Sequence, residues 1–144
     1  MVKIKKKKVV IGGTFNVLHK GHEALLRKAF DLGEVTIGLT SNSMASKARR
    51  KRVKDFKDRK KGLEDFTMKE FSVKPKIVKI KDKFGPTLEE DFDYIVVSPA
   101  TYATAVLINQ ERQKRRKKPL KIVKIEFILG KDGIPLSATK ILKR

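Results

Sequence analysis

The sequence passes from a strand into a helix within Val9-Val10-Ile11-Gly12-Gly13-Thr14-Phe15-Asn16-Val17-Leu18-His19-Lys20-Gly21-His22. The apolar run is β-branched, as in a buried strand, and the paired glycines permit a tight turn and a close approach of the backbone to a ligand. The only two histidines of the chain, His19 and His22, lie where the helix begins. Backbone N–H groups and the helix dipole attract phosphate at such a junction, so the imidazoles indicate chemistry on a phosphate.

Length and composition narrow the class of protein. The 144 residues are enough for one domain with a sizeable core, which we expect to span 1–144. The absence of cysteine excludes disulfides and thiolate metal sites, and no third ligand accompanies the histidines to form a metal site. No apolar run could cross a bilayer, and the basic start lacks the apolar segment of a signal peptide. We expect a cytoplasmic protein with no membrane partner, as a monomer or small homo-oligomer.

The formal net charge of +20 is extreme for this length. One interpretation is attraction to polyanions, either nucleic acid or highly phosphorylated small molecules. The other is a lysine-rich solvated surface of the kind found in heat-adapted proteins. Both stay open, because the basic residues are spread over almost every segment and outline no single footprint. Nucleic-acid binding, if any, is expected to be nonspecific.

The apolar pattern alternates short strands with longer helices. Helical spacing predicts a helix that ends near Gly33, a second over 56–71, and a third around 103–107 that stops at Pro119. Strands are predicted over 9–11, 35–39, 77–80, 94–97 and 122–127. This order predicts the α/β class, as a single Rossmann-like three-layer domain with a five-stranded parallel sheet. Ligands of such folds bind at the carboxyl ends of the strands, near a topological switch point.

Three loops are predicted to meet at that edge of the sheet. The first holds Gly12, Gly13 and the hydroxyl of Thr14, and it matches neither G-x-G-x-x-G nor a P-loop. The second follows the strand over 94–97, where Ser98 is a good N-cap and Pro99 a good first helical residue. A capped helix alone explains that pattern, and only its position makes Ser98 a ligand candidate.

The third loop begins a short final helix that Ser137 can cap, with the hydroxyl of Thr139 and the charge of Lys140 close behind. The exposed N–H groups of such a helix start can bind a second phosphate. Taken alone, this is an ordinary helix start. Taken with the histidine loop, it completes a pocket of the size of a triphosphate.

These loops carry a family resemblance. The residues Thr14-Phe15 and His19-Lys20-Gly21-His22 resemble the T/H-x-G-H signature of the nucleotidylyltransferase superfamily, and Leu136-Ser137-Ala138-Thr139-Lys140 resembles its second signature, I-S-S-T-x-R. Within that superfamily the chain resembles the archaeal-type phosphopantetheine adenylyltransferases over nearly its whole length.

The chain departs from the family pattern at four positions. Ala138 replaces a serine, and Lys140 replaces an arginine and so lacks the planar fork that grips phosphate. Ala100 stands where relatives often have glutamate, and Asn16 where aspartate is commoner. None of these changes removes a histidine, so they bear on the details of binding rather than on the reaction.

The resemblance implies transfer of AMP from ATP to 4′-phosphopantetheine, which gives dephospho-coenzyme A and pyrophosphate. It implies that His22 binds the α-phosphate and His19 the leaving pyrophosphate, that Thr14 positions the attacking phosphate, and that Lys47 neutralises the transferring group. Mg²⁺ is then held mostly by water and substrate oxygens. The remaining residues expected to contact the substrates are Gly12, Gly13, Phe15, Ser98, Ser137, Ala138, Thr139 and Lys140, and also Arg112 from the basic segment at the end of the third helix.

Two alternatives remain open at this point. A sibling transferase that uses FMN or glycerol phosphate as acceptor, or CTP as donor, would share motifs that read only phosphates. A basic nucleic-acid-binding module on the same fold is the other, although two tyrosines and no tryptophan leave little platform for base stacking. The basic segment 47–61 is either a mobile flap over the triphosphate or a solvated helix face, and 112–118 fits the basic end of a helix.

Overall fold

A sheet of five parallel strands organises residues 6–48 and 52–126, the part of the chain that the computed structural model describes. The strand order is β3-β2-β1-β4-β5, so the order reverses beside β1. The elements are β1 Lys8–Gly13, α1 Lys20–Leu32, β2 Glu34–Thr40, α2 Asn42–Ala48, α3 Phe56–Phe71, β3 Lys76–Ile80, the 3₁₀ helix η1 Gly85–Leu88, β4 Tyr94–Val97, α4 Tyr102–Lys114 and β5 Lys121–Lys124. The Rossmann-like parallel sheet predicted from the sequence is confirmed.

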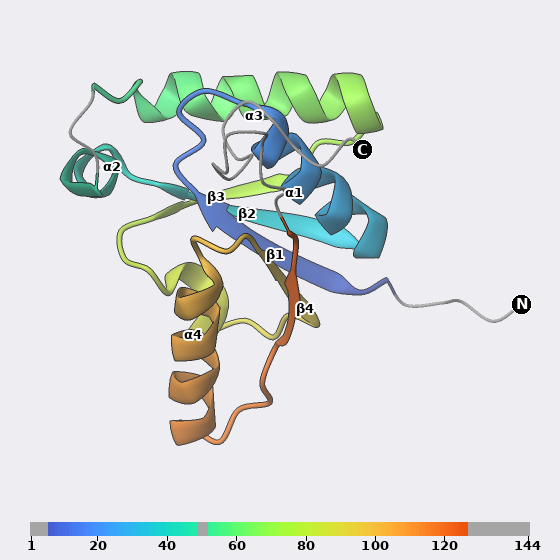
Figure 1. The fold of residues 1–144 in the computed structure, drawn as a ribbon, viewed down its shortest axis with the longest axis vertical. Coiled ribbons are helices and arrows are strands. Elements are labelled where there is room, and N and C mark those ends of the chain that lie inside the picture. Colours follow the sequence, from blue (N-terminus) through green and yellow to red (C-terminus); the bar gives the residue numbers. More distant parts are fainter. Residues whose placement is uncertain (1–5, 49–51, 127–144) are drawn as a thin grey trace, which may run out of the picture.

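Helices cover both faces of the sheet (Figure 1), with α1 and α3 on one side and α4 on the other. The alternation within β1 shows why both faces need cover. Val9 and Ile11 pack with residues of α1 and α3, whereas Val10 packs with residues of α4, η1 and β4. Because a strand buried on both faces has no polar side, these runs are continuously apolar. The three-layer prediction is therefore confirmed.

The start of α4 differs from the sequence prediction. The helix begins at Tyr102 and not at Pro99, so the prediction that Ser98 caps it is wrong. Residues 98–101 form a turn instead, in which the N–H of Ser98 donates to Thr101 Oγ1 at 3.1 Å and the N–H of Thr101 donates to the carbonyl of Ser98 at 3.1 Å. The turn is as good a local solution for this sequence as a cap, and it keeps Ser98 at the end of β4.

Two short elements were not predicted, namely α2 and η1. Both are shorter than the window of about 11–18 residues over which apolar periodicity identifies a helix, which is why the pattern of the sequence does not reveal them. None of the helices within the described residues is long and apolar enough to cross a membrane.

Arg112 is buried, and its guanidinium forms hydrogen bonds within the fold. Its side chain is 1% exposed, and its guanidinium donates to the carbonyls of Thr87, Glu90 and Lys118 at 2.7, 3.1 and 2.6 Å and to a carboxylate oxygen of Asp91 at 2.7 Å. This corrects the expectation that Arg112 binds the nucleotide. Because arginine presents its donors in a rigid fork, one side chain joins α4 to the segment between η1 and β4.

The bond from Arg112 lowers the pKa of Asp91, and the nearby positive charges of Arg112, Lys117 and Lys8 add to that effect. A carboxylate whose pKa is lower in the folded state stabilises the fold at a pH above its unfolded value and loses that contribution as the pH falls through the folded value. We therefore expect Asp91→Asn to lower the free energy of unfolding at pH 7, and we expect this loss to shrink as the pH falls below the ordinary pKa of aspartate. Urea unfolding across this range measures the difference, with Asp31→Asn on α1 as the control. A constant difference at all pH values would contradict this assignment.

Candidate functional site

Two histidines cap the first helix reciprocally. His19 is the N-cap of α1, and its Nδ1 accepts hydrogen bonds from the N–H groups of Gly21 at 3.0 Å and His22 at 3.3 Å. In return, Nδ1 of His22 accepts from the N–H of His19 at 3.4 Å. Serine and glutamate usually form this capping box. Because each Nδ1 accepts a backbone proton, each neutral ring carries its own proton on Nε2, at the opposite side from the cap.

The two histidine rings stack on each other, and the ring of His22 also contacts the buried Phe15 in a tilted arrangement. Their centroids lie 3.7 Å apart, and the ring of Phe15 lies 4.8 Å from that of His22. Phe15 is 2% exposed and has a φ of +47°, in the left-handed region that side chains other than glycine rarely adopt. A Cβ on Gly13 would lie 3.0 Å from the Phe15 ring. The side chain of Phe15 thus supports His22 from the core, and Gly13 leaves room for it.

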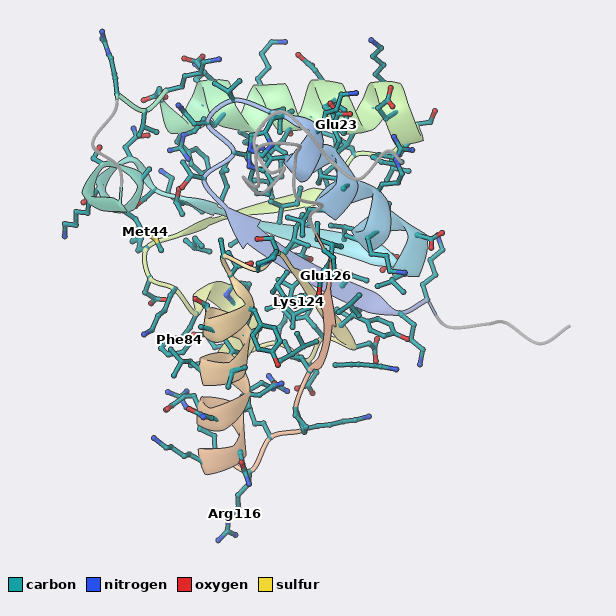
Figure 2. The ribbon with its side chains drawn as sticks, viewed as in Figure 1. Glu23, Met44, Phe84, Arg116, Lys124 and Glu126 are labelled. Carbon is teal, nitrogen blue, oxygen red and sulfur yellow. The ribbon has the colours of Figure 1, made fainter. Side chains whose placement is uncertain are left out.

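A cavity of about 170 Å³ lies at the carboxyl ends of the strands, on the α4 side of the sheet. Backbone at Gly12 and Gly13 forms one wall, and side chains such as Ile80 and Thr104 form others. Met44 and Phe84, which also line it, lie at the same end of the sheet, whereas Arg116 marks the far end of α4 (Figure 2). Its surface is mainly apolar. The sequence did not reveal this cavity, because its walls come from β1, β2, β3, β4, α2, η1 and α4.

Hydrogen bonds hold the loop between β1 and α1 against the end of β2 and against residues that follow β2. Thr14 Oγ1 accepts from Thr40 Oγ1 at 3.0 Å, and the carbonyl of Thr14 accepts from the guanidinium of Arg59 at 3.1 Å. The side-chain oxygen of Asn16 accepts from the N–H of Lys54 at 2.7 Å. Thr40 and Arg59 were not identified from the sequence, where one is a strand residue and the other is one cation among many in 47–61.

Lys47 lies exposed in the last turn of α2, at the same edge of the sheet. It lines a shallow hollow with Ser41, Lys79 and Lys81, and Met44 lines both this hollow and the apolar cavity. The structure thus brings Gly12, Gly13, Thr14 and Lys47 to one end of the fold, where Ser98 also follows β4. The predicted phosphate contacts at Ser137, Ala138, Thr139 and Lys140 lie outside the described residues.

The sequence was compared with protein families and with known proteins, and both comparisons found similar proteins. A model of the cytidylyltransferase-like family matches residues 10–144. A phosphopantetheine adenylyltransferase of Methanosarcina mazei is 46% identical over 142 residues, which cover 94% of this chain and 90% of that protein. One of Archaeoglobus fulgidus is 43% identical, covering 93% of this chain and 91% of that protein.

Solved structures agree on the fold. The crystal structure of an Archaeoglobus fulgidus protein described as of unknown function is 43% identical, with a TM-score of 0.79 over 82% of this chain and 88% of that one. A lipopolysaccharide core biosynthesis protein of Thermoplasma volcanium is 21% identical, with a TM-score of 0.68 over 84% of this chain and 97% of that one. The second likeness shows the shared fold alone.

Proposed function

We propose, because this chain belongs to the cytidylyltransferase-like family and resembles phosphopantetheine adenylyltransferases of archaea, that it transfers AMP from ATP to the phosphate of 4′-phosphopantetheine. An oxygen of the acceptor phosphate forms a bond to the α-phosphorus of ATP. The bond from that phosphorus to the bridging oxygen breaks, and pyrophosphate leaves with the electron pair. The products are dephospho-coenzyme A and pyrophosphate.

The observation that carries the proposal is the reciprocal histidine cap at the start of α1, together with an apolar cavity that is lined by Gly12 and Gly13 at the end of β1. The acceptor is already an anion near neutral pH, so the reaction needs neither a nucleophilic side chain nor a general base. Catalysis then consists of aligning two phosphates and stabilising the charge that grows on the transferring and leaving groups. Nε2–H donors at a helix N-terminus supply that stabilisation.

We assign each of these side chains a role in binding or stabilising the phosphates. His22 donates to the α-phosphate, His19 to the leaving pyrophosphate, and Lys47 neutralises charge from α2. Thr14 positions the attacking phosphate. We assign Ser137, Thr139 and Lys140 to the β- and γ-phosphates of ATP, as the second signature of the family implies.

The apolar cavity suits the uncharged arm of the acceptor. Pantetheine has a chain of methylene, methyl and amide groups behind its phosphate, and ligand pockets combine apolar walls with a few polar groups in this way. Thr104 supplies a hydroxyl group among apolar neighbours such as Ile80 and Ile108. The phosphate of a ligand held there would meet the backbone of Gly12 and Gly13.

Magnesium enters the proposal as part of the ATP substrate. No three His, Asp or Glu side chains within residues 6–48 and 52–126 lie close enough together to hold a metal ion. Mg²⁺ keeps several waters and binds readily to substrate phosphates, so it fits a site that offers donors to the phosphates and leaves the ion to ATP. Its chemistry there is to neutralise phosphate charge.

The decisive experiment is pyrophosphate release with Mg²⁺ and each pair of donor and acceptor. We expect release with ATP and 4′-phosphopantetheine and none with FMN, with glycerol phosphate or without acceptor. CTP in place of ATP is expected to be a poor donor. Release with a different acceptor would keep the reaction class and overturn the substrate, whereas no release from any pair would overturn the proposal.

The cavity leads to a separate prediction about the acceptor. Replacing Thr104 with leucine adds bulk to the cavity wall, and we expect the KM for phosphopantetheine to rise about tenfold or more, since about 1.4 kcal/mol of lost binding is tenfold. The KM for ATP is expected to change less than twofold. Steady-state kinetics with each substrate varied in turn measures both. Ala103→Leu is the matched control, because Ala103 is exposed one position away on α4.

A further inference from the structure

We propose that Arg59, acting through Thr40, sets the direction in which the hydroxyl of Thr14 donates and so makes it a donor to a substrate phosphate. Arg59 and Thr40 are then positioning residues, and Thr14 is the group that touches the substrate. The inference rests on the proposed function, because it concerns how the attacking phosphate is held. It adds two residues to the site that neither of the two family signatures contains.

The three residues form a continuous chain of hydrogen bonds. Arg59 Nη1 donates to Thr40 Oγ1 at 3.2 Å, and Thr40 Oγ1 donates to Thr14 Oγ1 at 3.0 Å. The same Nη1 also donates to the carbonyl of Thr14 at 3.1 Å. Arg59 therefore holds both the backbone and, through one intermediate, the side chain of Thr14.

The chemistry of arginine decides which oxygen accepts and which donates along this series of hydrogen bonds. A guanidinium has only donors and stays charged at every physiological pH, so Thr40 Oγ1 must accept from it. The hydroxyl proton of Thr40 then turns to Thr14 Oγ1, which accepts it. The proton of Thr14 itself is left to point away from Thr40, and hydrogen bonds in such a chain strengthen one another. A hydroxyl in this state is a donor suited to an anionic oxygen.

The chain is buried at its origin and ends at the site. Arg59 is 2% exposed and Thr40 6% exposed, whereas Thr14 is half-buried. Thr40 lines the apolar cavity together with Gly12 and Gly13, which directly precede Thr14. Because the guanidinium of Arg59 is shielded from water, its hydrogen bond to Thr40 Oγ1 is strong.

Further contacts hold Arg59 in place. Its Nε donates to the carbonyl of Lys54 at 2.8 Å, and Nη2 donates to the side-chain oxygen of Asn42 at 3.0 Å. Asn42 in turn accepts from the N–H of Phe56 at 2.8 Å and donates to Asp55 at 2.9 Å. The guanidinium is thus positioned by α2, by α3 and by the segment that joins them.

The test uses Thr40→Val, which removes the hydroxyl and nearly keeps the shape. We expect kcat/KM for phosphopantetheine to fall roughly tenfold to a hundredfold, the effect of losing one hydrogen bond to a charged group. The KM for ATP is expected to change less than twofold. Thr40→Ser keeps the hydroxyl and is expected to stay within about threefold of wild type. The matched control is Thr67→Val, which removes a buried hydroxyl on α3 that donates to carbonyls of its own helix.

A double-mutant cycle separates the relay from a general loss of stability. If Thr40 acts through Thr14, then Thr14→Val and Thr14→Val/Thr40→Val have the same kcat/KM within about twofold. Additive losses would overturn the relay, as would a Thr40→Ser variant as slow as Thr40→Val. Equal kinetics for Thr40→Val and Thr67→Val would also overturn it.

Calorimetric titration with 4′-phosphopantetheine distinguishes a failure of this inference from a failure of the proposed function. A wild-type protein that binds this ligand without turnover would refute the proposed reaction, and the relay would be judged on binding. Weaker binding by Thr40→Val than by Thr67→Val would then support the relay. Equal binding by the two variants, or no binding to wild type, would overturn it.

Discussion

Replacing His19 with asparagine, or His22 with glutamine, is expected to lower kcat by roughly 10²–10³-fold, the effect of losing one preorganised transition-state donor. Both substitutes retain a side-chain oxygen that accepts the backbone N–H now bound by Nδ1, so the start of α1 stays capped. What they lose is the Nε2–H that we assign to the phosphates. The measurement is pyrophosphate release at saturating ATP and phosphopantetheine.

The alanine variant of His19 supplies the matching control for the cap. His19→Ala removes both the acceptor and the Nε2 donor, and we expect it to lower the free energy of unfolding by about 1 kcal/mol in addition to the loss of kcat. His19→Asn is expected to unfold like wild type. If His19→Asn kept the kcat of wild type, the histidines would be caps alone, and the proposed mechanism would be wrong.

Replacing Arg112 with methionine is expected to lower the free energy of unfolding by about 3 kcal/mol, because three carbonyls that are buried or partly buried lose their charged donor at once. Those carbonyls belong to Thr87, Glu90 and Lys118. Methionine fills part of the volume but offers no N–H. Urea unfolding monitored by circular dichroism measures the change.

The control for this variant is Arg115→Met at the end of the same helix. Arg115 is half exposed and pairs with Glu111 within one helical turn, so its loss is expected to cost less than about 1 kcal/mol. If Arg115→Met lowered the free energy of unfolding as much as Arg112→Met does, the structural role that we assign to the buried guanidinium of Arg112 would be wrong. Because Thr87 lines the apolar cavity, we also expect Arg112→Met to raise the KM for phosphopantetheine.

The sheet and the position of the histidines were readable from the sequence because both depend on near neighbours. The strands of 9–11 and 35–39 are apolar and β-branched, and these properties predict buried parallel strands without any knowledge of their partners. The three-residue spacing of His19 and His22 predicts one turn of a helix start. Parallel connectivity then brings the carboxyl ends of β1 and β4 to one edge, which locates the site.

The local sequence pattern did not predict the structure where the same residues suit two different local conformations. Ser98 and Pro99 are ideal for a helix start, yet the chain forms a turn through Thr101 and begins the helix at Tyr102. The short elements α2 and η1 carry too few residues for a repeated apolar pattern to identify them. In each case the choice depends on contacts with the rest of the fold, which a window of sequence does not contain.

The two buried arginines show most clearly what the sequence alone does not determine. Arg59 and Arg112 lie in basic segments where nothing in the sequence separates them from their exposed neighbours. Arg59 reaches Thr14 across 45 residues, and Arg112 reaches Thr87 across 25. Residue type and spacing are enough to place the strands, the helix start and the histidines, since these follow from short-range sterics and hydrogen bonding. The partner of a buried charge follows from long-range packing, which exists only once the chain has folded.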